Sequence, residues 1–209
     1  MVARDAITLG ILAGGRGTRL GGIEKAWIMR DGIAQVQRLA KRFEGEVSQV
    51  LVSANRDLER FEALGMSAVP DRTRDLGPIG GLDALAQACT SPWLLTVPVD
   101  LVFVNDCLIP TLASAGGQGA SVEDEDGPQP LVALWNVEAL RSHVSSSLRK
   151  QGSTTPSAGL DSCVRRNDER LSVQSLQRDL AMPRIRLNGV RFGNLNTPED
   201  LAAAHATLP

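Results

Sequence analysis

The chain has 209 residues, 43% of them hydrophobic, and a formal net charge of -2. This length and apolar content suffice for the core of one domain, and the lack of a basic excess argues against a general binder of nucleic acid or anionic membranes. No apolar run approaches the roughly 20 residues that span a bilayer, the N-terminus lacks a signal-peptide core, and three separated cysteines without a CxxC motif indicate reduced thiols. We therefore expect a cytoplasmic protein with no nucleic-acid or membrane partner.

The first half of the chain alternates between two patterns. Short apolar segments rich in β-branched residues predict buried strands, and segments with apolar residues three or four apart predict helices. Buried strands that alternate with helices are typical of a mostly parallel sheet covered on both faces. We therefore expect an α/β, Rossmann-like fold. The predicted strands span residues 6–14, 48–55, 66–71 and 93–100, and the predicted helices span 32–43, 57–65, 77–89 and 105–116.

The second half departs from this alternation. Residues 119–135 predict an antiparallel strand pair around the turn EDEDG, which we interpret as a solvated hairpin tip. A helix is expected over 137–148. The polar, Ser- and Gly-rich segment 149–169 is interpreted as a mobile insertion within a single domain of residues 1–209.

The C-terminal part contains two late strand-like runs within residues 182–196 and a final helix over 197–208. Thr197 is a good N-cap for that helix, Pro198 suits its first position, and Asp200 stands where a capping-box acid would. The helix start is therefore predicted from local signals alone.

The segment LGILAGGRGTRLGG, residues 9–22, places six glycines and two arginines at and after the first predicted strand, and Lys25 follows it. It lacks the GK pair of a Walker A loop, and GRGTRL lacks the third glycine of a Rossmann fingerprint. Glycines let backbone N–H groups approach an anion closely, and Arg16, Arg19 and Lys25 add charge-assisted donors. The pattern indicates a polyphosphate-binding loop, although Arg16 fits a solvated surface position equally well.

Polar residues stand where the next three predicted strands end. Asn55 ends the second, Asp71 the third and Asp100 the fourth. Parallel sheets bind ligands at the carboxyl ends of their strands, where the strand order reverses. We therefore expect these side chains and the glycine-rich loop to form one site.

LAGGRGTRLGGIEK resembles the L-A-G-G-x-x-x-R-M-G-x-x-K signature of the nucleotidyltransferases that activate sugars and cofactors. Later segments follow in the expected order: VSANRD, VPD with GPIGGL, VPVD and NLNTPEDL. GPIGGL, NLNTPEDL and Asn55 make the chain most similar to the molybdenum cofactor guanylyltransferase family. The resemblance covers the chain except for about residues 149–169, and it implies a fold of the nucleotide-diphospho-sugar transferase type.

This resemblance implies transfer of GMP from GTP to the terminal phosphate of molybdopterin, with release of pyrophosphate. Such a reaction depends on alignment and charge stabilisation more than on a general base, because the nucleophile is already an anionic phosphate oxygen. The implied catalytic residues are Arg19, Lys25 and Asp100, with Asp100 as the ligand of Mg²⁺. The implied nucleotide-binding residues are Leu12, Ala13, Gly14, Gly15, Gly17, Lys25, Asn55, Asp71 and Asp100, and the pterin-side candidates are Gly80, Asn194 and Asn196.

Several of these residues also have a purely structural interpretation. Asn55 fits a strand-end cap, Asp71 fits a loop cap, and the late asparagines fit a turn ahead of the final helix. The tryptophans fit packing positions, and Trp27 is the one we consider for stacking on a pterin, because it lies two residues after Lys25.

Other functions would use the same residues. A cytidylyltransferase acting on molybdopterin, or a sugar-phosphate nucleotidyltransferase, needs the same loop with another base or acceptor. A non-catalytic carrier of the molybdenum cofactor would bind without turnover, but the presence of Arg19, Lys25 and Asp100 favours an enzyme. The expected partners are GTP and the molybdopterin cofactor, followed by molybdenum-insertion proteins and apo-molybdoenzymes or their chaperones.

Overall fold

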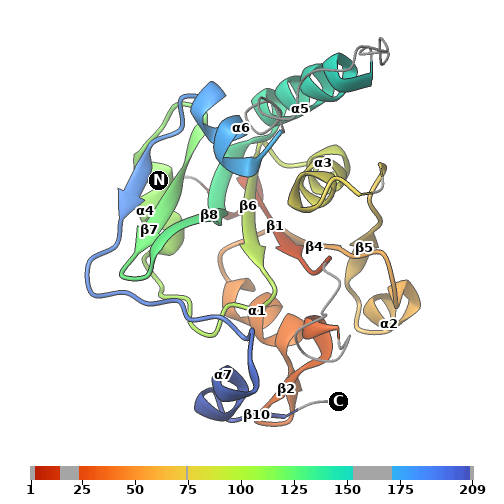
Figure 1. Cartoon of the computed structure of the whole chain (residues 1–209), viewed down its shortest axis with the longest axis vertical. Coiled ribbons are helices and arrows are strands. Elements are labelled where there is room, and N and C mark those ends of the chain that lie inside the picture. The colour runs from red at the N-terminus through yellow and green to blue at the C-terminus, as the bar shows by residue number, and fades with distance from the viewer. Residues whose placement is uncertain (1–2, 15–23, 74, 153–170, 208–209) are drawn as a thin grey trace, which may run out of the picture.

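The computed structural model describes residues 3–14, 24–73, 75–152 and 171–207. In that part of the chain, strands of the central sheet follow the order β5-β4-β1-β6-β8-β7-β9 (Figure 1). These strands are β1 (Ile7–Leu12), β4 (Gln49–Ser53), β5 (Ser67–Val69), β6 (Trp93–Pro98), β7 (Gly119–Asp124), β8 (Gly127–Asn136) and β9 (Arg184–Arg186).

The four strands expected to be parallel do pair in parallel. β1 lies between β4 and β6, and β5 extends the sheet beyond β4. The chain therefore builds outward from β1 in one direction with β4 and β5, and then returns to the other side of β1 with β6. This reversal of strand order creates the crevice in which α/β sheets bind ligands.

The predicted antiparallel pair is confirmed as β7 and β8, and β8 also pairs antiparallel with β6. Of the two late strands expected within 182–196, only β9 forms. The prediction of the second strand is wrong, because that part of the segment makes one isolated bridge, between Leu101 and Asn194. Gly189 and Gly193 adopt positive φ angles of 71° and 63°, which turn the backbone out of the extended path of a strand.

Helices cover both faces of the sheet (Figure 1). One apolar cluster joins the sheet to α1 and α4, and a second joins it to α3, α5 and α6. No helix in the described part of the chain is long and apolar enough to cross a membrane. The helices are α1 (Gln35–Phe43), α2 (Leu58–Glu62), α3 (Pro78–Ala88), α4 (Leu108–Ser114), α5 (Val137–Gly152), α6 (Val173–Asp179) and α7 (Pro198–Ala203).

α5 continues to Gly152 and so includes the first residues of the insertion expected at about 149–169. Leu148 packs against the cluster shared by α3, α5 and α6, so the helix keeps a buried face up to its last turns. Residues 153–169 of the expected insertion lie outside the described residues. α6, which no pattern indicated, begins at a capping box formed by Ser172 and Ser175.

A small second sheet joins the C-terminus to the region after the first loop. It contains β10 (Ala206–Thr207), β2 (Met29–Arg30) and β3 (Ile33–Ala34) in that order. The capping box of Thr197 and Asp200 is confirmed at the start of α7. The helix is shorter than expected, because His205 adopts a positive φ of 51° and the chain then turns into β10.

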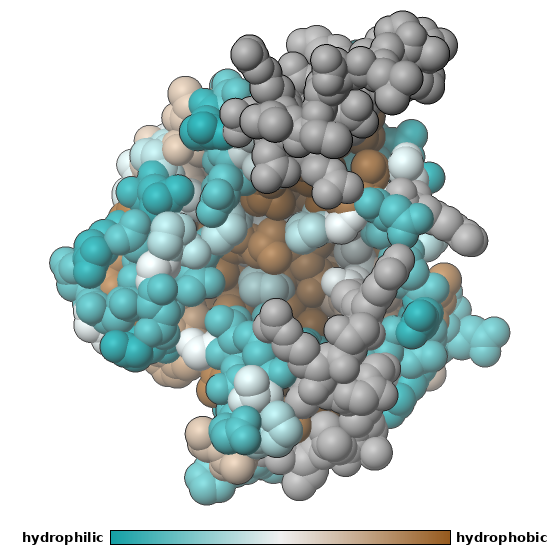
Figure 2. Space-filling model, in the orientation of Figure 1, coloured by the Kyte–Doolittle hydropathy of each residue, from teal (hydrophilic) through white to brown (hydrophobic). Residues whose placement is uncertain are grey.

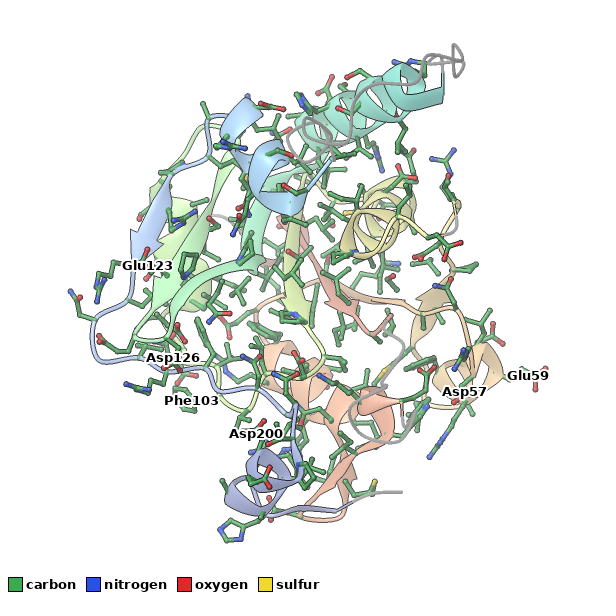
Figure 3. All side chains as sticks on the ribbon, in the orientation of Figure 1. Asp57, Glu59, Phe103, Glu123, Asp126 and Asp200 are labelled. Atoms are coloured by element: carbon green, nitrogen blue, oxygen red, sulfur yellow. The ribbon has the colours of Figure 1, made fainter. Side chains whose placement is uncertain are left out.

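The EDEDG turn is not a simple solvated tip. Asp124 is only 1% exposed, and its carboxylate accepts hydrogen bonds from the Phe192 N–H, the Asp126 N–H and the Gln129 amide. Burial alone would raise the pKa of Asp124, but these hydrogen bonds favour the ionised form and the pKa is lowered. Glu123 and Asp126, visible at the hairpin in Figure 3, pair with Arg186 and Arg191. The turn therefore anchors the segment that leads to the C-terminal asparagines.

Replacing Asp124 by Asn is expected to lower the free energy of unfolding by about 1–3 kcal/mol near neutral pH. Asp124 accepts hydrogen bonds on both carboxylate oxygens, and Asn keeps only one oxygen, so at least one buried N–H donor would face an NH2 group. Since the folded-state pKa is lowered, this stabilisation is present above the unfolded-state pKa and is lost as the pH falls through the folded-state value. Urea unfolding at about pH 7 and about pH 3 should show the gap between wild type and variant shrinking in acid. The matched control is Asp106→Asn, whose side chain is 94% exposed; an equal loss in the control would contradict the argument.

Close packing of α3 against the sheet depends on Gly81. A Cβ atom at this position would lie 2.5 Å from Ser53 Oγ and 2.9 Å from Leu12 Cδ2, at the ends of β4 and β1. The absence of a side chain at Gly81 therefore allows α3 to pack closely against the sheet edge where the predicted site residues lie.

Gly81→Ala is expected to lower the free energy of unfolding by about 1–3 kcal/mol, because α3 must move away from two strand ends. Gly45→Ala is the control, since a Cβ there meets nothing within 4 Å. Chemical denaturation of both variants and the wild type measures the free energies of unfolding that are to be compared. Equal stability of Gly81→Ala and wild type would show that the approach of α3 tolerates a methyl group.

Candidate active site

The start of the glycine-rich loop lies between the ends of β4 and β6. Ala13 donates its N–H to the Ser53 carbonyl at 2.9 Å, and Val99 donates to the Leu12 carbonyl at 3.0 Å, so the ladder continues past the strand ends. Gly14 is exposed, and the space that a side chain would occupy there is open. The described part of the loop therefore presents backbone to the crevice. The predicted residues Gly15, Arg16, Gly17 and Arg19 lie outside the described residues.

Lys25 forms the centre of the candidate site. It begins the short 3-10 helix η3 (Lys25–Trp27), and its Nζ lies 2.7 Å from Asp100 Oδ2 and 2.5 Å from Asn196 Oδ1. The Lys25 and Asp100 side chains are 22% and 19% exposed, so the ion pair is shielded from bulk water but still reachable. Three predicted residues from distant segments thus share one contact, which we call the Lys25 contact.

Two backbone segments hold the oxygens of this contact in place. The Leu195 N–H donates to the Asp100 carbonyl at 2.9 Å, and the Val102 N–H donates to the Gly193 carbonyl at 3.3 Å. Asn194 lies in the same pairing through its bridge to Leu101. The structure therefore places Asn194 and Asn196 beside Asp100, whereas their expected pterin-side role stays a prediction.

A second polar group forms at the ends of β4 and β5. Asn55 Nδ2 donates to Asp71 Oδ2 at 2.9 Å, and the Asp71 N–H donates to Asn55 Oδ1 at 2.9 Å. Gly80 also lies here, because a Cβ on it would be 3.2 Å from the Asp71 carboxylate. The structure therefore places Gly80 with Asn55 and Asp71 rather than with the two asparagines with which the resemblance grouped it.

Trp27 is a packing residue, and its expected role as a stacking platform is not supported. Trp27 is only 3% exposed. Its Nε1 donates to Asp57 Oδ2 at 2.9 Å, and its ring centre lies 4.6 Å from that of Phe61. The Arg60 guanidinium lies 3.9 Å from the ring centroid. Trp27 instead ties the segment after Lys25 to the loop that follows Asn55, a link that no sequence pattern indicated.

Glu24 modifies the charge beside Lys25. Burial raises the pKa of Glu24, the nearby Asp57 carboxylate raises it further, and Arg56 opposes both effects. Burial and Asp57 thus act against the charge of Glu24, whereas Arg56, whose Nη1 lies 3.9 Å from Glu24 Oε1, favours it.

The viewed face of the molecule is hollowed in front of the central strands and beside α3 (Figure 2). Apolar residues form the floor of this hollow, and polar residues border it on the left of the view. Among the described residues, no group of three or more His, Cys, Asp or Glu side chains is placed to hold a metal ion. Among the described residues, the oxygen atoms that accept from Lys25 are those of one carboxylate and one amide, Asp100 and Asn196.

The sequence is similar to known nucleotidyltransferases. Residues 9–169 match the family model of the MobA-like NTP transferase domain. The molybdenum cofactor guanylyltransferase of Cupriavidus necator is 37% identical over 155 residues, which cover 69% of this chain and 78% of that protein. That of Albidiferax ferrireducens is 35% identical over 160 residues, covering 69% and 76%.

Solved structures share the fold. The molybdopterin-guanine dinucleotide biosynthesis protein A from Archaeoglobus fulgidus has a TM-score of 0.62 at 19% identity, over 94% of this chain and 96% of that one. The 2-C-methyl-D-erythritol 4-phosphate cytidylyltransferase from Thermus thermophilus also has a TM-score of 0.62, at 16% identity, over 93% and 95%. The match over residues 9–169, together with the architecture and the residues gathered at the strand ends, establishes that the chain belongs to the MobA-like NTP transferase family and is a nucleotidyltransferase.

Proposed function

We propose that the protein transfers GMP from GTP to the terminal phosphate of molybdopterin, forming the guanine dinucleotide cofactor and pyrophosphate. The observation that carries this proposal is the Lys25 contact, which places a cation and a carboxylate beside the glycine-rich loop at the point of strand reversal. The choice of guanine and of molybdopterin is supported by the names of the relatives that share 35% to 37% identity with the chain.

In the proposed reaction, an oxygen of the molybdopterin phosphate attacks the α-phosphorus of GTP, and the bond from that phosphorus to the bridging β-phosphate oxygen breaks. The attacking oxygen needs no base, because a phosphate monoester is already largely ionised near neutral pH. Lys25 and Arg19 would bind the phosphates and offset the charge on the departing pyrophosphate. The backbone of Leu12, Ala13 and Gly14, continued by Gly15 and Gly17, would hold the nucleotide in line for attack.

The donor set fits Mg²⁺. This ion prefers hard oxygen ligands and is commonly held by one or two carboxylates together with substrate phosphates and water. Asp100 would supply the carboxylate, and Asn196 offers an amide oxygen that contacts the same Lys25 ammonium. Bound there, Mg²⁺ would neutralise charge on the phosphate oxygens.

Asn55 and Asp71 would recognise the nucleoside. Their reciprocal hydrogen bonds hold both side chains at the ends of β4 and β5. A carboxylate can accept two hydrogen bonds, either from the N–H groups on the Watson–Crick edge of guanine or from the O–H groups of ribose. We propose that Asp71 accepts hydrogen bonds from the nucleoside, while Asn55 fixes the orientation of the Asp71 carboxylate.

Pyrophosphate release by the purified protein with Mg²⁺ and molybdopterin should occur with GTP and not with CTP, ATP or UTP. Release with CTP would keep the mechanism and assign a cytidylyltransferase instead. Release with GTP only when a sugar phosphate replaces molybdopterin would reassign the acceptor. These alternatives leave the phosphate-binding residues unchanged, so nucleotide and acceptor must be varied separately.

Asp100→Asn is expected to lower kcat by at least about 100-fold while the protein remains folded, because one charge is removed from the metal and phosphate site. Asp106→Asn, six residues further along, is the control for a surface carboxylate. Initial rates of pyrophosphate release and thermal unfolding report on activity and fold. If the Asp100→Asn variant delivered the molybdenum cofactor to an apo-enzyme as well as the wild type does, the carrier function would be favoured over the transferase.

A further inference from the structure

Asp200 does more than cap α7. Its Oδ2 accepts the N–H of Thr197 at 2.9 Å, as in any capping box, and it also accepts the N–H of Asn196 at 3.0 Å. The Asp200 N–H completes the box by donating to Thr197 Oγ1 at 3.2 Å. Figure 3 shows Asp200 at the start of α7, beside the segment that leads into the helix. One carboxylate thus fixes the backbone of two successive residues.

The first of these residues carries the side chain that reaches Lys25. Asn196 Oδ1 accepts from Lys25 Nζ, whose other partner is Asp100 Oδ2. Asp200 therefore binds the backbone of the residue whose side chain takes part in the Lys25 contact. The backbone hydrogen bonds from Asn196 and Thr197, together with the positive charge of Lys25, lower the pKa of Asp200 and keep it ionised.

α7 has anchors that do not involve Asp200. Leu201 packs with Ile28 and Leu195 in a small apolar cluster. β10 pairs with β2, and Arg30 Nε donates to the Ala204 carbonyl. Removal of the Asp200 carboxylate should therefore leave α7 attached and change mainly the backbone of residues 196–197.

We propose that Asp200 is a positioning residue of the active site, which holds Asn196 so that its amide oxygen and Asp100 together fix the Lys25 ammonium. The role of the ammonium in binding GTP phosphates rests on the proposed function, whereas the positioning itself does not. Thr197 provides a matched comparison, because its hydroxyl takes part in the same capping box without contacting Asn196.

The first test measures Lys25 directly and needs no substrate. The chain has three lysines, Lys25, Lys41 and Lys150, so acetylation by acetic anhydride can be followed at each by mass spectrometry. Asp200→Ala should raise the rate at Lys25 about fivefold relative to Lys41, as the loss of one hydrogen bond allows. Thr197→Ala should leave the ratio unchanged. An unchanged ratio in Asp200→Ala, or an equal rise in both variants, would overturn the proposal.

The second test uses catalysis. Asp200→Ala should raise the KM for GTP about tenfold, because the Lys25 ammonium is held less firmly for the GTP phosphates. Asp200→Asn should restore most of the affinity for GTP, because the amide oxygen of Asn still accepts the N–H bonds. Thr197→Ala should keep the KM of the wild type, although it loses about as much thermal stability as Asp200→Ala. In the Asn196→Ala background, Asp200→Ala should have no further effect, because the two act through one contact. Additive losses would refute the positioning role. Absence of GTP turnover in the wild type would refute the proposed function instead, and the acetylation ratio would still decide the role of Asp200.

Discussion

β1 pairs in parallel with β4 on one side and with β6 on the other, and the rest of the site depends on this pairing. The three strands end at the same edge, and hydrogen bonds from Ala13 to Ser53 and from Val99 to Leu12 carry the ladder past their last residues. Neighbouring strands lie about 4.8 Å apart, so the residues after β4 and β6 come within about 10 Å of each other across the loop. The Asn55–Asp71 pair and Asp100 therefore flank the same backbone.

Charge then decides what this edge can bind. Lys25 lies between a carboxylate and an amide oxygen, in a position that is partly shielded from water. Shielding strengthens the attraction between the ammonium and its partners relative to a surface ion pair. The same shielding would strengthen its attraction to a phosphate.

The C-terminal segment completes the site from outside the central sheet. It crosses beside the residues that follow β6, where Leu195 donates to the Asp100 carbonyl, and then enters α7. At its other end the buried carboxylate of Asp124 accepts the Phe192 N–H and anchors the segment to the β7–β8 hairpin. The short sheet formed by β10 and β2 ties the chain after α7 to the region after Lys25. The segment is therefore held at both ends, and Asp200 sets the position of Asn196 within it.

Local patterns in the sequence by themselves determined the four parallel strands and the cap formed by Thr197 and Asp200, because each depends on residues only a few positions apart. The tertiary structure alone decided the Lys25 contact with Asn196, which joins residues 171 positions apart, and the burial of Asp124, whose partner Phe192 is 68 positions away. It also grouped Gly80 with Asp71 and placed Trp27 in the core. Strand order and the packing of helices on the sheet set these long-range approaches, and neither leaves a periodic signal along the chain.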